Sequence, residues 1–583
     1  METVNVKING MSVAAPKGST ILEAAKLACI DIPTLCYLKE INEIGACRIC
    51  VVEVKGARSL VASCVYPIAD GMEIWTNTPK VLDSRKKTLE LILSNHDRKC
   101  LSCVRSGDCE LQKLCKDLNV TAEGLYDGER TEYAIDGSAA HMYRDNNKCI
   151  LCRRCSAVCE HTQGIGVIGA NERGFKTNIA CAFDMELGET SCVSCGQCIA
   201  VCPTGALMEK DFTDDVIAAI SDPDKFVVVQ TAPSVRAGLG EDFGLPVGTN
   251  VEGKMVSALR RLGFDKVFDT DWAADLTIME EATEFLHRVK NGGTLPLITS
   301  CSSGWVKYCE HYYPDMIDNL SSCKSPQQMF GAMSKTYLAE KMGVDPAKIV
   351  TVSVMPCTAK KFEIGRDDQS AAGSDIPDVD ISITTRELAR LIKRVGLDFH
   401  ALPDENFDDP MGSSTGAAVI FGVTGGVMEA ALRTAVETLT GEELASLDFN
   451  EVRGTQGIKE ATYNVAGMDI NVAVASGLAN ARVLLDKVQS GEANYHFIEI
   501  MGCPGGCVNG GGQPQQPASF RNFNDIRELR AKAIYDIDKA STFRKSHENP
   551  AIKALYDEFL GEPGSHKAHE LLHTSYVKRS INK

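Results

Sequence analysis

Twenty-four cysteines are the feature that most limits how this chain of 583 residues can fold. Eight of them form two runs with one spacing, C-x2-C-x2-C-x3-C, and a proline follows the second run. The runs are Cys149, Cys152, Cys155 and Cys159, and Cys192, Cys195, Cys198 and Cys202. In two-cluster iron–sulfur proteins, three cysteines of such a run bind one 4Fe-4S cluster and the fourth binds the other. The repeat therefore predicts a pair of 4Fe-4S clusters in a chain that carries electrons.

Composition and charge narrow the class of protein further. Hydrophobic residues make up 44% of the chain and charged residues 24%, as in a globular protein of several domains. The net charge of −17 argues against nucleic acid as the main partner. There is no apolar run of membrane-spanning length and no signal-peptide pattern at the N-terminus. We therefore expect a cytoplasmic chain whose cysteines bind metal rather than form disulfides, with zinc as the alternative for an isolated C-x2-C pair.

Residues 1–78 predict a β-grasp domain with a 2Fe-2S centre. Residues 4–14 alternate as two strands that turn at Asn9-Gly10, which is a hairpin signal. We expect Ser19 to cap the helix that follows, with Glu23 in a capping interaction. Four cysteines then lie on loops, at a spacing that differs from the plant type: Cys36, Cys47, Cys50 and Cys64.

Residues 79–138 predict a second small domain with a 4Fe-4S cluster. An amphipathic helix over residues 79–95 leads to four possible ligands, His96, Cys100, Cys103 and Cys109. The alternative is that His96 lies on the surface and Cys115 is the fourth ligand, and the spacing fits both. Residues 110–138 are polar and are typical of a connector. The twin cysteine runs follow, in a predicted ferredoxin-type domain over residues 139–209.

Residues 210–583 predict an α/β domain of two lobes. Short apolar runs typical of buried strands occur at residues 226–230, 295–298, 350–354, 379–383 and 497–500, and helices are predicted at 326–342 and 386–395. The alternation of strands and helices indicates α/β architecture. The whole chain is thus predicted to be a multidomain α+β and α/β protein.

The cysteines of the second half follow the predicted strands. Cys301, Cys357 and Cys503 each come after an apolar run, and Cys507 lies in a glycine-rich loop. Because open α/β sheets form their sites at the carboxyl ends of strands, these four can converge on one more cubane. The remaining cysteines are expected to be packing residues: Cys29, Cys115, Cys181, Cys309 and Cys323.

Three loops of this half are similar to the signature loops of the iron-only (FeFe) hydrogenases. They are residues 299–305, 355–363 and 501–512. The order of the N-terminal cluster domains also resembles the large clostridial-type members, so the resemblance covers nearly the whole chain. It implies reversible oxidation of hydrogen at an H-cluster, which is a 4Fe-4S cluster bridged by a cysteine to a diiron unit with CO, cyanide and azadithiolate ligands.

The resemblance also implies roles for single residues. Cys357 and Cys503 would bind the cubane, and Cys507 would bridge it to the diiron unit. Lys360 would donate to a cyanide, and Glu363 would orient Lys360 or the adjacent loop. The residues that would surround the diiron unit are Ala232, Pro233, Ser234, Met355, Pro356 and Met501. The family pattern also favours His96 as a cluster ligand.

The first loop departs from the family pattern at position 302. The family has two adjacent cysteines there, of which the first relays protons and the second binds the cubane. Here the pair is Cys301-Ser302. By position Cys301 is the relay and Ser302 stands where a ligand belongs; a shift of register would make Cys301 the ligand, and both interpretations stay open. A serine here resembles the NAD(P)-linked branch of the family.

The rest of the implied proton route consists of Glu281, Ser321 and Glu284, with Arg288 nearby. Residues 277–289 are predicted to be helical, so the two carboxylates share a face. Without the family context, such a face is more often a solvated acidic surface. Carboxylates in a buried wall would instead exchange protons readily.

The sequence also limits which partner can exchange electrons with this chain. We find no glycine-rich dinucleotide fingerprint after a strand, so we do not expect this chain alone to bind NAD(H). The resemblance implies the catalytic subunit of an NAD(P)-linked, electron-bifurcating complex with flavin-bearing subunits. The alternatives are a stand-alone hydrogenase that uses ferredoxin, and a non-hydrogenase electron carrier or cluster-assembly protein. The implied cofactors are one 2Fe-2S cluster, three accessory 4Fe-4S clusters and the H-cluster.

Overall fold

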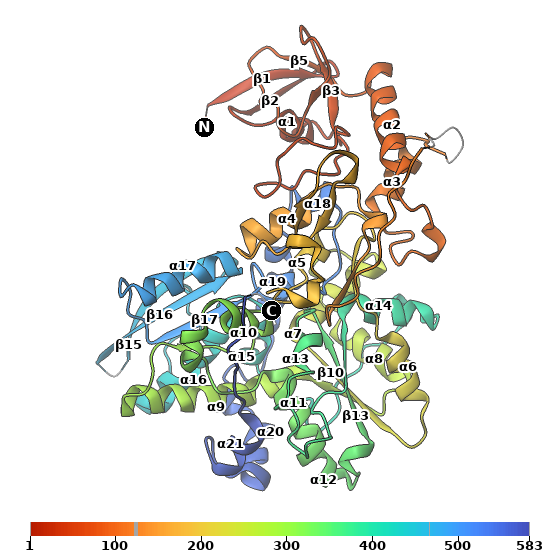
Figure 1. Cartoon of the computed structure of the whole chain (residues 1–583). Helices are drawn as coiled ribbons and strands as arrows, with labels where there is room; N and C mark the ends of the chain where they lie inside the picture. Colours follow the sequence, from red (N-terminus) through yellow and green to blue (C-terminus); the bar gives the residue numbers. More distant parts are fainter. Residues whose placement is uncertain (1, 122–125, 127, 466, 582–583) are drawn as a thin grey trace.

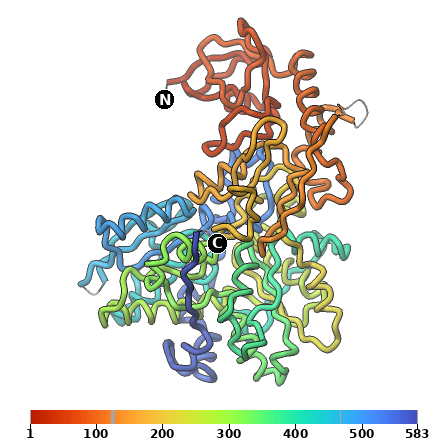
Figure 2. The backbone as a smooth tube through the Cα atoms, viewed as in Figure 1, coloured from red at the N-terminus to blue at the C-terminus, as the bar shows by residue number. Residues whose placement is uncertain are grey.

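The computed structural model describes residues 2–121, 126, 128–465 and 467–581. The N-terminal domain lies at one end of the molecule, the segment with the twin cysteine runs lies in the middle, and two α/β lobes lie side by side at the other end (Figures 1 and 2). Within the described ranges, no helix is both long and apolar enough to cross a membrane. The predicted order of domains therefore matches the order of bodies in space.

The N-terminal domain is a mixed sheet with the strand order β2-β1-β5-β3-β4 and one helix. Its elements are β1 (Thr3–Ile8), β2 (Met11–Pro16), α1 (Ile21–Leu27), β3 (Val51–Val54), β4 (Val61–Ala62) and β5 (Glu73–Trp75). The predicted hairpin is confirmed, because β1 and β2 pair antiparallel and Asn9 and Gly10 both have positive φ, as a type I′ turn requires. The predicted cap was wrong by one residue: Thr20, not Ser19, forms the capping box with Glu23.

The two middle segments consist of short elements around loops. The predicted helix at 79–95 is α2 (Pro79–Ser94), and α3 (Glu110–Asp117) occupies the start of the predicted connector. Residues 122–125 and 127 of that connector lie outside the described residues. The segment with the twin runs has two small antiparallel ladders and two short helices: β6 (Met142–Arg144) with β9 (Leu207–Glu209), β7 (Gly169–Asn171) with β8 (Asn178–Ala180), α4 (Arg154–Ala157) and α5 (Gln197–Ala200).

Each lobe of the large domain has its own four-stranded sheet. One sheet is wholly parallel, with the order β11-β10-β13-β14; the other has the order β12-β17-β16-β15, with β15 as an antiparallel edge strand. The strands are β10 (Phe226–Thr231), β11 (Lys266–Asp269), β12 (Leu297–Ile298), β13 (Ile349–Met355), β14 (Ile381–Thr384), β15 (Ile458–Val465), β16 (Met468–Ser476) and β17 (Phe497–Met501). The five apolar runs singled out in the sequence form β10, β12, β13, β14 and β17, which confirms the α/β prediction for this half.

The helix α9 (Thr270–Asn291) lies between the two lobes. Trp272 and Leu276 belong to the core beside the first sheet, whereas Ile278 and Phe285 belong to the core beside the second. Other helices cover the sheets: α8 (Glu252–Leu262), α11 (Pro326–Met333), α12 (Ala339–Met342), α14 (Thr385–Arg394), α16 (Gly426–Thr440), α17 (Leu478–Gln489) and α19 (Ile526–Ala540). Because α9 is packed on both sides, its polar residues are drawn into the interior.

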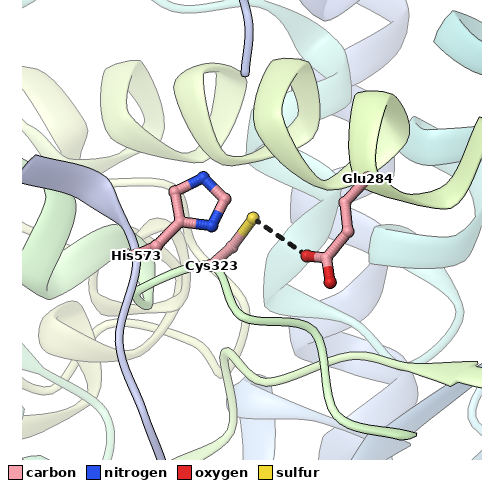
Figure 3. Close-up of side chains that lie close together, drawn as sticks. All are labelled: Glu284, Cys323 and His573. Carbon is pink, nitrogen blue, oxygen red and sulfur yellow. Dashed lines mark hydrogen bonds between the residues drawn. The ribbon is translucent and has the colours of Figure 1, made fainter. Parts of the chain in front are cut away.

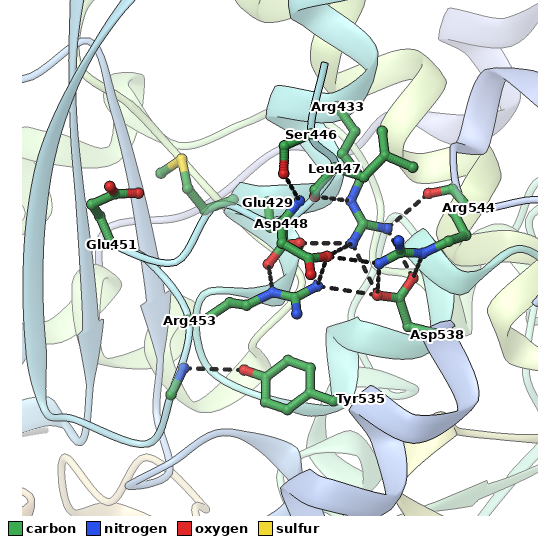
Figure 4. Close-up of polar contacts among 12 residues, drawn as sticks. Glu429, Arg433, Ser446, Leu447, Asp448, Glu451, Arg453, Tyr535, Asp538 and Arg544 are labelled. Carbon is green, nitrogen blue, oxygen red and sulfur yellow. Dashed lines mark hydrogen bonds and ion pairs between the residues drawn. The ribbon is translucent and has the colours of Figure 1, made fainter. Parts of the chain in front are cut away.

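A network of charged side chains joins α16 to α19 (Figure 4). Its members are Glu429, Arg433, Asp448, Arg453, Asp538 and Arg544. Arg433 is fully buried and donates to both carboxylate oxygens of Asp538 at 3.0 Å. Burial alone would raise the pKa of Asp538, but hydrogen bonds from Arg544 and Arg433 lower it to about 2. The three guanidinium groups thus balance the three carboxylates inside the second lobe.

Candidate functional site

The twin cysteine runs line two separate cavities. One cavity is lined by Cys149, Cys152, Cys155 and Cys202, and the other by Cys159, Cys192, Cys195 and Cys198. The fourth cysteine of each run thus lies in the cavity of the other run. Burial raises the pKa of Cys149 and of Cys152 to about 12, because an isolated thiolate loses its hydration there. Four sulfurs around an enclosed space fit a cubane, whose iron would stabilise the thiolates.

The strand ends of both lobes converge at a third group of cysteines. Cys357 follows β13, and Cys503 follows β17. Burial and then the neighbouring Cys357 raise the pKa of Cys507 to about 12, and the same causes raise the pKa of Cys503. The three sulfurs are therefore electrostatic neighbours. This arrangement fits a further cubane between the lobes.

Cys301 and Ser302, next to this group, have different neighbours. Burial, followed by the charge of Glu281 and then Cys507, raises the pKa of Cys301 well above its ordinary value. Ser302 is the residue before α10 (Ser303–Tyr312), and its Oγ accepts a hydrogen bond from the Gly502 amide at 3.0 Å. Cys301 thus faces Glu281, and Ser302 faces the backbone next to Cys503.

Lys360 is fixed by a buried carboxylate. Its Nζ donates to the Cys301 carbonyl at 3.1 Å and to Glu363 Oε2 at 2.8 Å. Glu363 also accepts hydrogen bonds from Ser303, Ser325 and Gln327 at 2.7, 2.8 and 2.9 Å. A carboxylate with so many donors cannot move freely, so the ammonium group of Lys360 stays beside the cysteines.

The other predicted neighbours of the cofactor lie at strand ends. Ala232 follows β10, and Pro233 and Ser234 begin the helix α7 (Pro233–Gly238). Ser234 is fully buried and donates to the Gly422 carbonyl at 3.2 Å. Met355 and Met501 end β13 and β17, and each is 3% exposed. Pro356 accepts a hydrogen bond from the Gly512 amide at 2.8 Å, so the second and third loops are tied together.

The carboxylates of α9 are buried rather than solvated. Glu281 is 2% exposed, and burial raises its pKa to about 8 although Ser321 opposes the shift. Ser321 Oγ donates to Glu284 Oε2 at 3.2 Å, and Arg288 forms an ion pair with Glu284 at 2.6 Å. Glu281, Glu284 and Arg288 thus follow one another along α9 toward its C-terminal end, and Ser321, from outside the helix, bonds to both carboxylates.

Three residues beside Glu284 escaped the sequence analysis: Ser322, Cys323 and His573. Figure 3 shows two of them, Cys323 and His573, next to Glu284. Ser322 Oγ donates to Glu284 Oε2 at 3.1 Å and lies 2.8 Å from His573 Nδ1. Cys323, expected only to pack, is buried, but its thiol also lies 3.8 Å from Glu284 Oε2. The adjacency of Ser321, Ser322 and Cys323 was the available signal. His573 is 251 residues from Ser322 and gave none.

The N-terminal ligand candidates also gather in space. The Sγ atoms of Cys50 and Cys64 are 3.3 Å apart, and the Cys47 amide donates to Cys36 Sγ at 3.5 Å. His96 is 8% exposed, and its Nδ1 has no partner among the described residues. Cys100, Cys103 and Cys109 lie in the same segment. Burial, and then the neighbouring Cys109 and Cys100, raise the pKa of Cys115 in this segment to about 11. A buried imidazole whose Nδ1 has no partner among the described residues fits a cluster ligand, while Cys115 lies close to Cys109 and Cys100.

The expectation that five cysteines merely pack was wrong for one of them. Cys181 and Cys309 are fully buried in apolar cores. Cys29 is instead exposed and has a φ of +56° just beyond α1. Cys29 thus occupies the left-handed position after a helix, outside the apolar face that the helical period predicts.

The second cavity of the twin runs abuts the catalytic loops. Thr358 Oγ1 donates to the Ser194 carbonyl at 2.7 Å, and Gln197 Nε2 donates to the Asn509 carbonyl at 2.8 Å. Burial and then the charge of Cys503 raise the pKa of Cys195, so these two cysteines are neighbours. Sequence reasoning missed Thr358 and Gln197, because each contact joins segments far apart in the chain.

The cysteine-lined cavities lead to a buried group of thiols, and a fixed lysine and buried carboxylates lie beside that group. These features together define the class of the protein as an iron–sulfur oxidoreductase. Comparison with family descriptions agrees with this class. Residues 1–79 match a 2Fe-2S iron-sulfur cluster binding domain, 85–123 an NADH-ubiquinone oxidoreductase-G iron-sulfur binding region, 148–206 a 4Fe-4S dicluster domain, 225–511 the C-terminal domain of the iron only hydrogenase large subunit, and 524–579 the iron hydrogenase small subunit.

Full-length relatives identify the family. The chain is 52% identical to the NADP-reducing hydrogenase subunit HndD of Solidesulfovibrio fructosivorans, over 99% of this chain and 100% of that one. It is 44% identical to Iron hydrogenase 1 of Clostridium pasteurianum, over 98% and 99%. A solved structure of the FeFe-hydrogenase HydA1 from Chlamydomonas reinhardtii superposes with a TM-score of 0.57 at 45% identity, over 63% of this chain and 99% of that one. The chain belongs to the FeFe (iron-only) hydrogenases and is an oxidoreductase that acts on hydrogen.

This membership confirms the predicted domain types and the predicted activity, in place of the alternative of a non-hydrogenase carrier or assembly protein. The domain limits at residues 78, 138 and 209 stay a prediction.

Proposed function

We propose that this chain is the catalytic subunit of a complex that couples 2H⁺ + 2e⁻ ⇌ H₂ to NADP through flavin-bearing partner subunits. The observation that carries the proposal is the similarity along the full length to a subunit of an NADP-reducing hydrogenase. The Cys301-Ser302 pair and the lack of a dinucleotide fingerprint in this sequence support it. We also propose a cytoplasmic location, which is supported by the many cysteines that would bind metal rather than form disulfides.

The ligand sets of the clusters follow from the cysteine groups. Cys36, Cys47, Cys50 and Cys64 would bind the 2Fe-2S cluster; His96, Cys100, Cys103 and Cys109 one 4Fe-4S cluster; and the two cavities of the twin runs one 4Fe-4S cluster each. Cys357, Cys503 and Cys507 would bind the H-cluster. When bound, the H-cluster supplies the diiron unit at which hydrogen reacts. Electrons would leave through the cavity that contains Cys195, since it abuts Cys503.

The residues around the H-cluster site would bind, orient and exclude water. Lys360 would donate to an anionic cyanide, and Glu363 would keep the ammonium group in place. Met355, Met501 and Pro233 would close the site to solvent, because the two methionines are buried at strand ends and Pro233 is buried at the start of α7. Ser234 is already bonded to Gly422 and would fix the loop after β10.

Protons would move along α9. Cys301 or Ser302 would exchange a proton with Glu281, which passes it by way of Ser321 to Glu284 and then to the surface near Arg288. Burial favours the protonated form of Glu281 near neutral pH, so its carboxyl can donate as well as accept. The hydrogen bond between Ser321 and Glu284 supports this order.

Within this route we assign the relay to Cys301 and the ligand position to Ser302. Cys301 neighbours Glu281, whereas Ser302 Oγ receives the Gly502 amide next to Cys503. The test compares Cys301→Ala with Ser302→Ala by iron content and electron paramagnetic resonance (EPR). We expect Cys301→Ala to keep the cubane and lose hydrogen turnover. Loss of the cubane in Cys301→Ala would show that Cys301 is the ligand.

Reconstitution with flavin-bearing subunits tests which electron partner the chain uses. The chain matured alone should oxidise hydrogen with a viologen dye but should not reduce NADP. Addition of the flavin-bearing subunits should start NADP reduction. The second candidate is a stand-alone hydrogenase that uses ferredoxin, which the similarity to Iron hydrogenase 1 over 98% of the chain favours. Full ferredoxin-linked turnover by an untagged preparation without flavin subunits would establish that candidate instead.

A further inference from the structure

His141 is a buried histidine that the catalytic route does not use. It precedes β6, is 1% exposed, and is neutral because burial lowers its pKa to about 3. Its carbonyl accepts a hydrogen bond from the Lys210 amide at 3.0 Å, which fixes the residue at the β6–β9 ladder. Among the described residues, neither ring nitrogen has a hydrogen-bond partner. A buried polar group left unpaired costs about 1–3 kcal/mol, so this position needs a partner that the described residues do not supply.

The side chain lines the cavity formed by Cys159, Cys192, Cys195 and Cys198. Gln163 lines the same cavity and is also 1% exposed. Its Oε1 accepts a hydrogen bond from the Leu478 amide at 3.2 Å, but no described residue pairs with its Nε2. Two buried N–H donors without partners therefore border a single cysteine-lined cavity.

The cavity of Cys149, Cys152, Cys155 and Cys202 differs in this respect. Asn146 Nδ2 donates to the Ile179 carbonyl at 3.0 Å, and Thr204 Oγ1 donates to the Lys148 carbonyl at 2.8 Å. Arg153, which also borders this cavity, is exposed to solvent. The side-chain amide and hydroxyl donors of Asn146 and Thr204 thus already have partners. The two cavities therefore differ in the hydrogen bonds that they can donate to a bound cluster.

We propose that His141 and Gln163 donate N–H hydrogen bonds to sulfur atoms of the 4Fe-4S cluster in their cavity and raise its reduction potential above that of the neighbouring cluster. Reduction adds one electron to the cluster, and a donor directed at sulfur stabilises the added negative charge. The inference rests on the proposed assignment of a cluster to this cavity. Because the cavity abuts the catalytic loops, a raised potential would retain an electron beside the active site.

The test is a redox titration of the holoprotein monitored by EPR. His141→Leu and Gln163→Leu should each shift the midpoint of one 4Fe-4S signal to more negative potential and leave the other signals unchanged. We expect about a tenfold change in the reduced-to-oxidised ratio at fixed potential, which equals about 59 mV for one electron. His141→Gln keeps an N–H donor and should restore most of the shift.

Met142→Leu is the matched control. Met142 lines the same cavity and is 1% exposed, but it has no donor, so its replacement should leave every midpoint in place. A second readout uses protein labelled with ¹⁵N-histidine. Pulsed EPR of the reduced wild type should show a weak imidazole coupling on that cluster, and the coupling should be lost in His141→Gln.

The possible results distinguish a failure of the hydrogen-bond inference from a failure of the cluster assignment on which it rests. Unchanged midpoints in both leucine variants at full iron content, or the same shift in Met142→Leu, would overturn the hydrogen-bond inference. If His141→Leu fails to load iron, the ¹⁵N coupling in the wild type decides, and its absence overturns the inference. A wild-type holoprotein with only one of the twin 4Fe-4S signals would overturn the cluster assignment itself.

Discussion

Glu281 illustrates how burial changes the chemistry of one side chain. On a solvated helix face this carboxyl would be ionised at neutral pH, but burial in α9 raises its pKa to about 8. The folded chain therefore binds a proton that the unfolded chain releases between its ordinary value of 4.5 and about 8. By linkage, this group makes the fold less stable as pH rises through that interval. The position costs stability and provides a proton donor next to the cysteines.

Replacement of Glu281 tests its role in proton transfer. We expect Glu281→Gln to lower hydrogen evolution by roughly 10²–10⁴-fold, the usual contribution of a positioned acid or base. Glu280→Gln is the matched control, because Glu280 is adjacent and buried but contacts Tyr556, the Gly564 amide and His573 rather than Ser321. It should stay within a few-fold of wild type in viologen-linked assays. Equal losses in both variants would show that the helix, not the proton route, is affected.

Among the elements, the contact between α5 and the loop after β13 joins the electron-carrying segment to the catalytic lobes. Gly196 has a φ of +68°, and a Cβ there would lie 2.3 Å from Thr358 Oγ1. Gly174, in the same segment, has a φ of +62° but open space around it. Alanine substitutions at Gly196 and Gly174 distinguish the effect of backbone strain from the effect of steric crowding. Both place a side chain in the left-handed region, but only the one at Gly196 meets another residue.

Gly196→Ala should therefore destabilise the chain by about 1–3 kcal/mol more than Gly174→Ala, since overpacking adds to the shared strain. Thermal unfolding under hydrogen checks the stability. Viologen-linked hydrogen oxidation should also slow in Gly196→Ala, whereas isotope exchange between H₂ and water, which needs no external electrons, should persist. Identical behaviour of the two variants would argue against a functional contact here.

The charged network between α16 and α19 is the other element-scale feature that can be tested. Arg433→Met leaves Glu429 and Asp538 short of a buried partner and should cost about 3–5 kcal/mol. Arg394→Met removes an ion pair with Asp214 whose side chains are 55% and 82% exposed, and should change stability by less than about 1 kcal/mol. Denaturant unfolding compares the two variants.

Asp538 has a lowered pKa, so its stabilisation of the fold is present above its unfolded value of 3.8 and is lost as pH falls toward 2.

On the scale of the whole molecule, the segment with the twin runs has a small apolar core. Its buried cluster includes Met142, Ile168, Ile179 and Ile199, and several cysteines pack against it. The large lobes have much more extensive cores. A segment with so little apolar burial depends on its clusters for stability, as small metal-binding domains do.

Iron removal should therefore unfold this segment first. After anaerobic treatment with a chelator, we expect limited proteolysis to cut within residues 139–209 before the lobes, and the first unfolding transition to move to lower temperature. Mass spectrometry of the fragments locates the cuts. Earlier cleavage in the lobes would show that the catalytic domain, rather than this segment, depends on its clusters.

The strands β10, β12, β13, β14 and β17 were predictable, because a buried parallel strand is a short apolar run whatever surrounds it, whereas β11, β15 and β16 were not singled out in the sequence. The N-terminal hairpin was predictable because Asn9-Gly10 specifies its turn locally. The cap at Thr20 was missed by one residue, since Ser19 and Thr20 are both good caps and only the backbone conformation distinguishes them. The partners His573 and Gln197 could not be found, because their contacts join distant segments and no periodicity records them.

The sequence by itself determined the kinds of cluster domain, because the spacing of cysteines along a loop limits which thiolates can bind one cluster. The chemistry came from the resemblance of three loops to the FeFe hydrogenases. The tertiary structure alone decided how the groups are arranged. It buries Glu281 between two lobes, and it places His141 and Gln163 at one cysteine-lined cavity with ring or amide nitrogens that no described residue pairs with. Burial and long-range contacts arise only when elements pack, and these set the pKa of an acid and the hydrogen bonds open to a cluster.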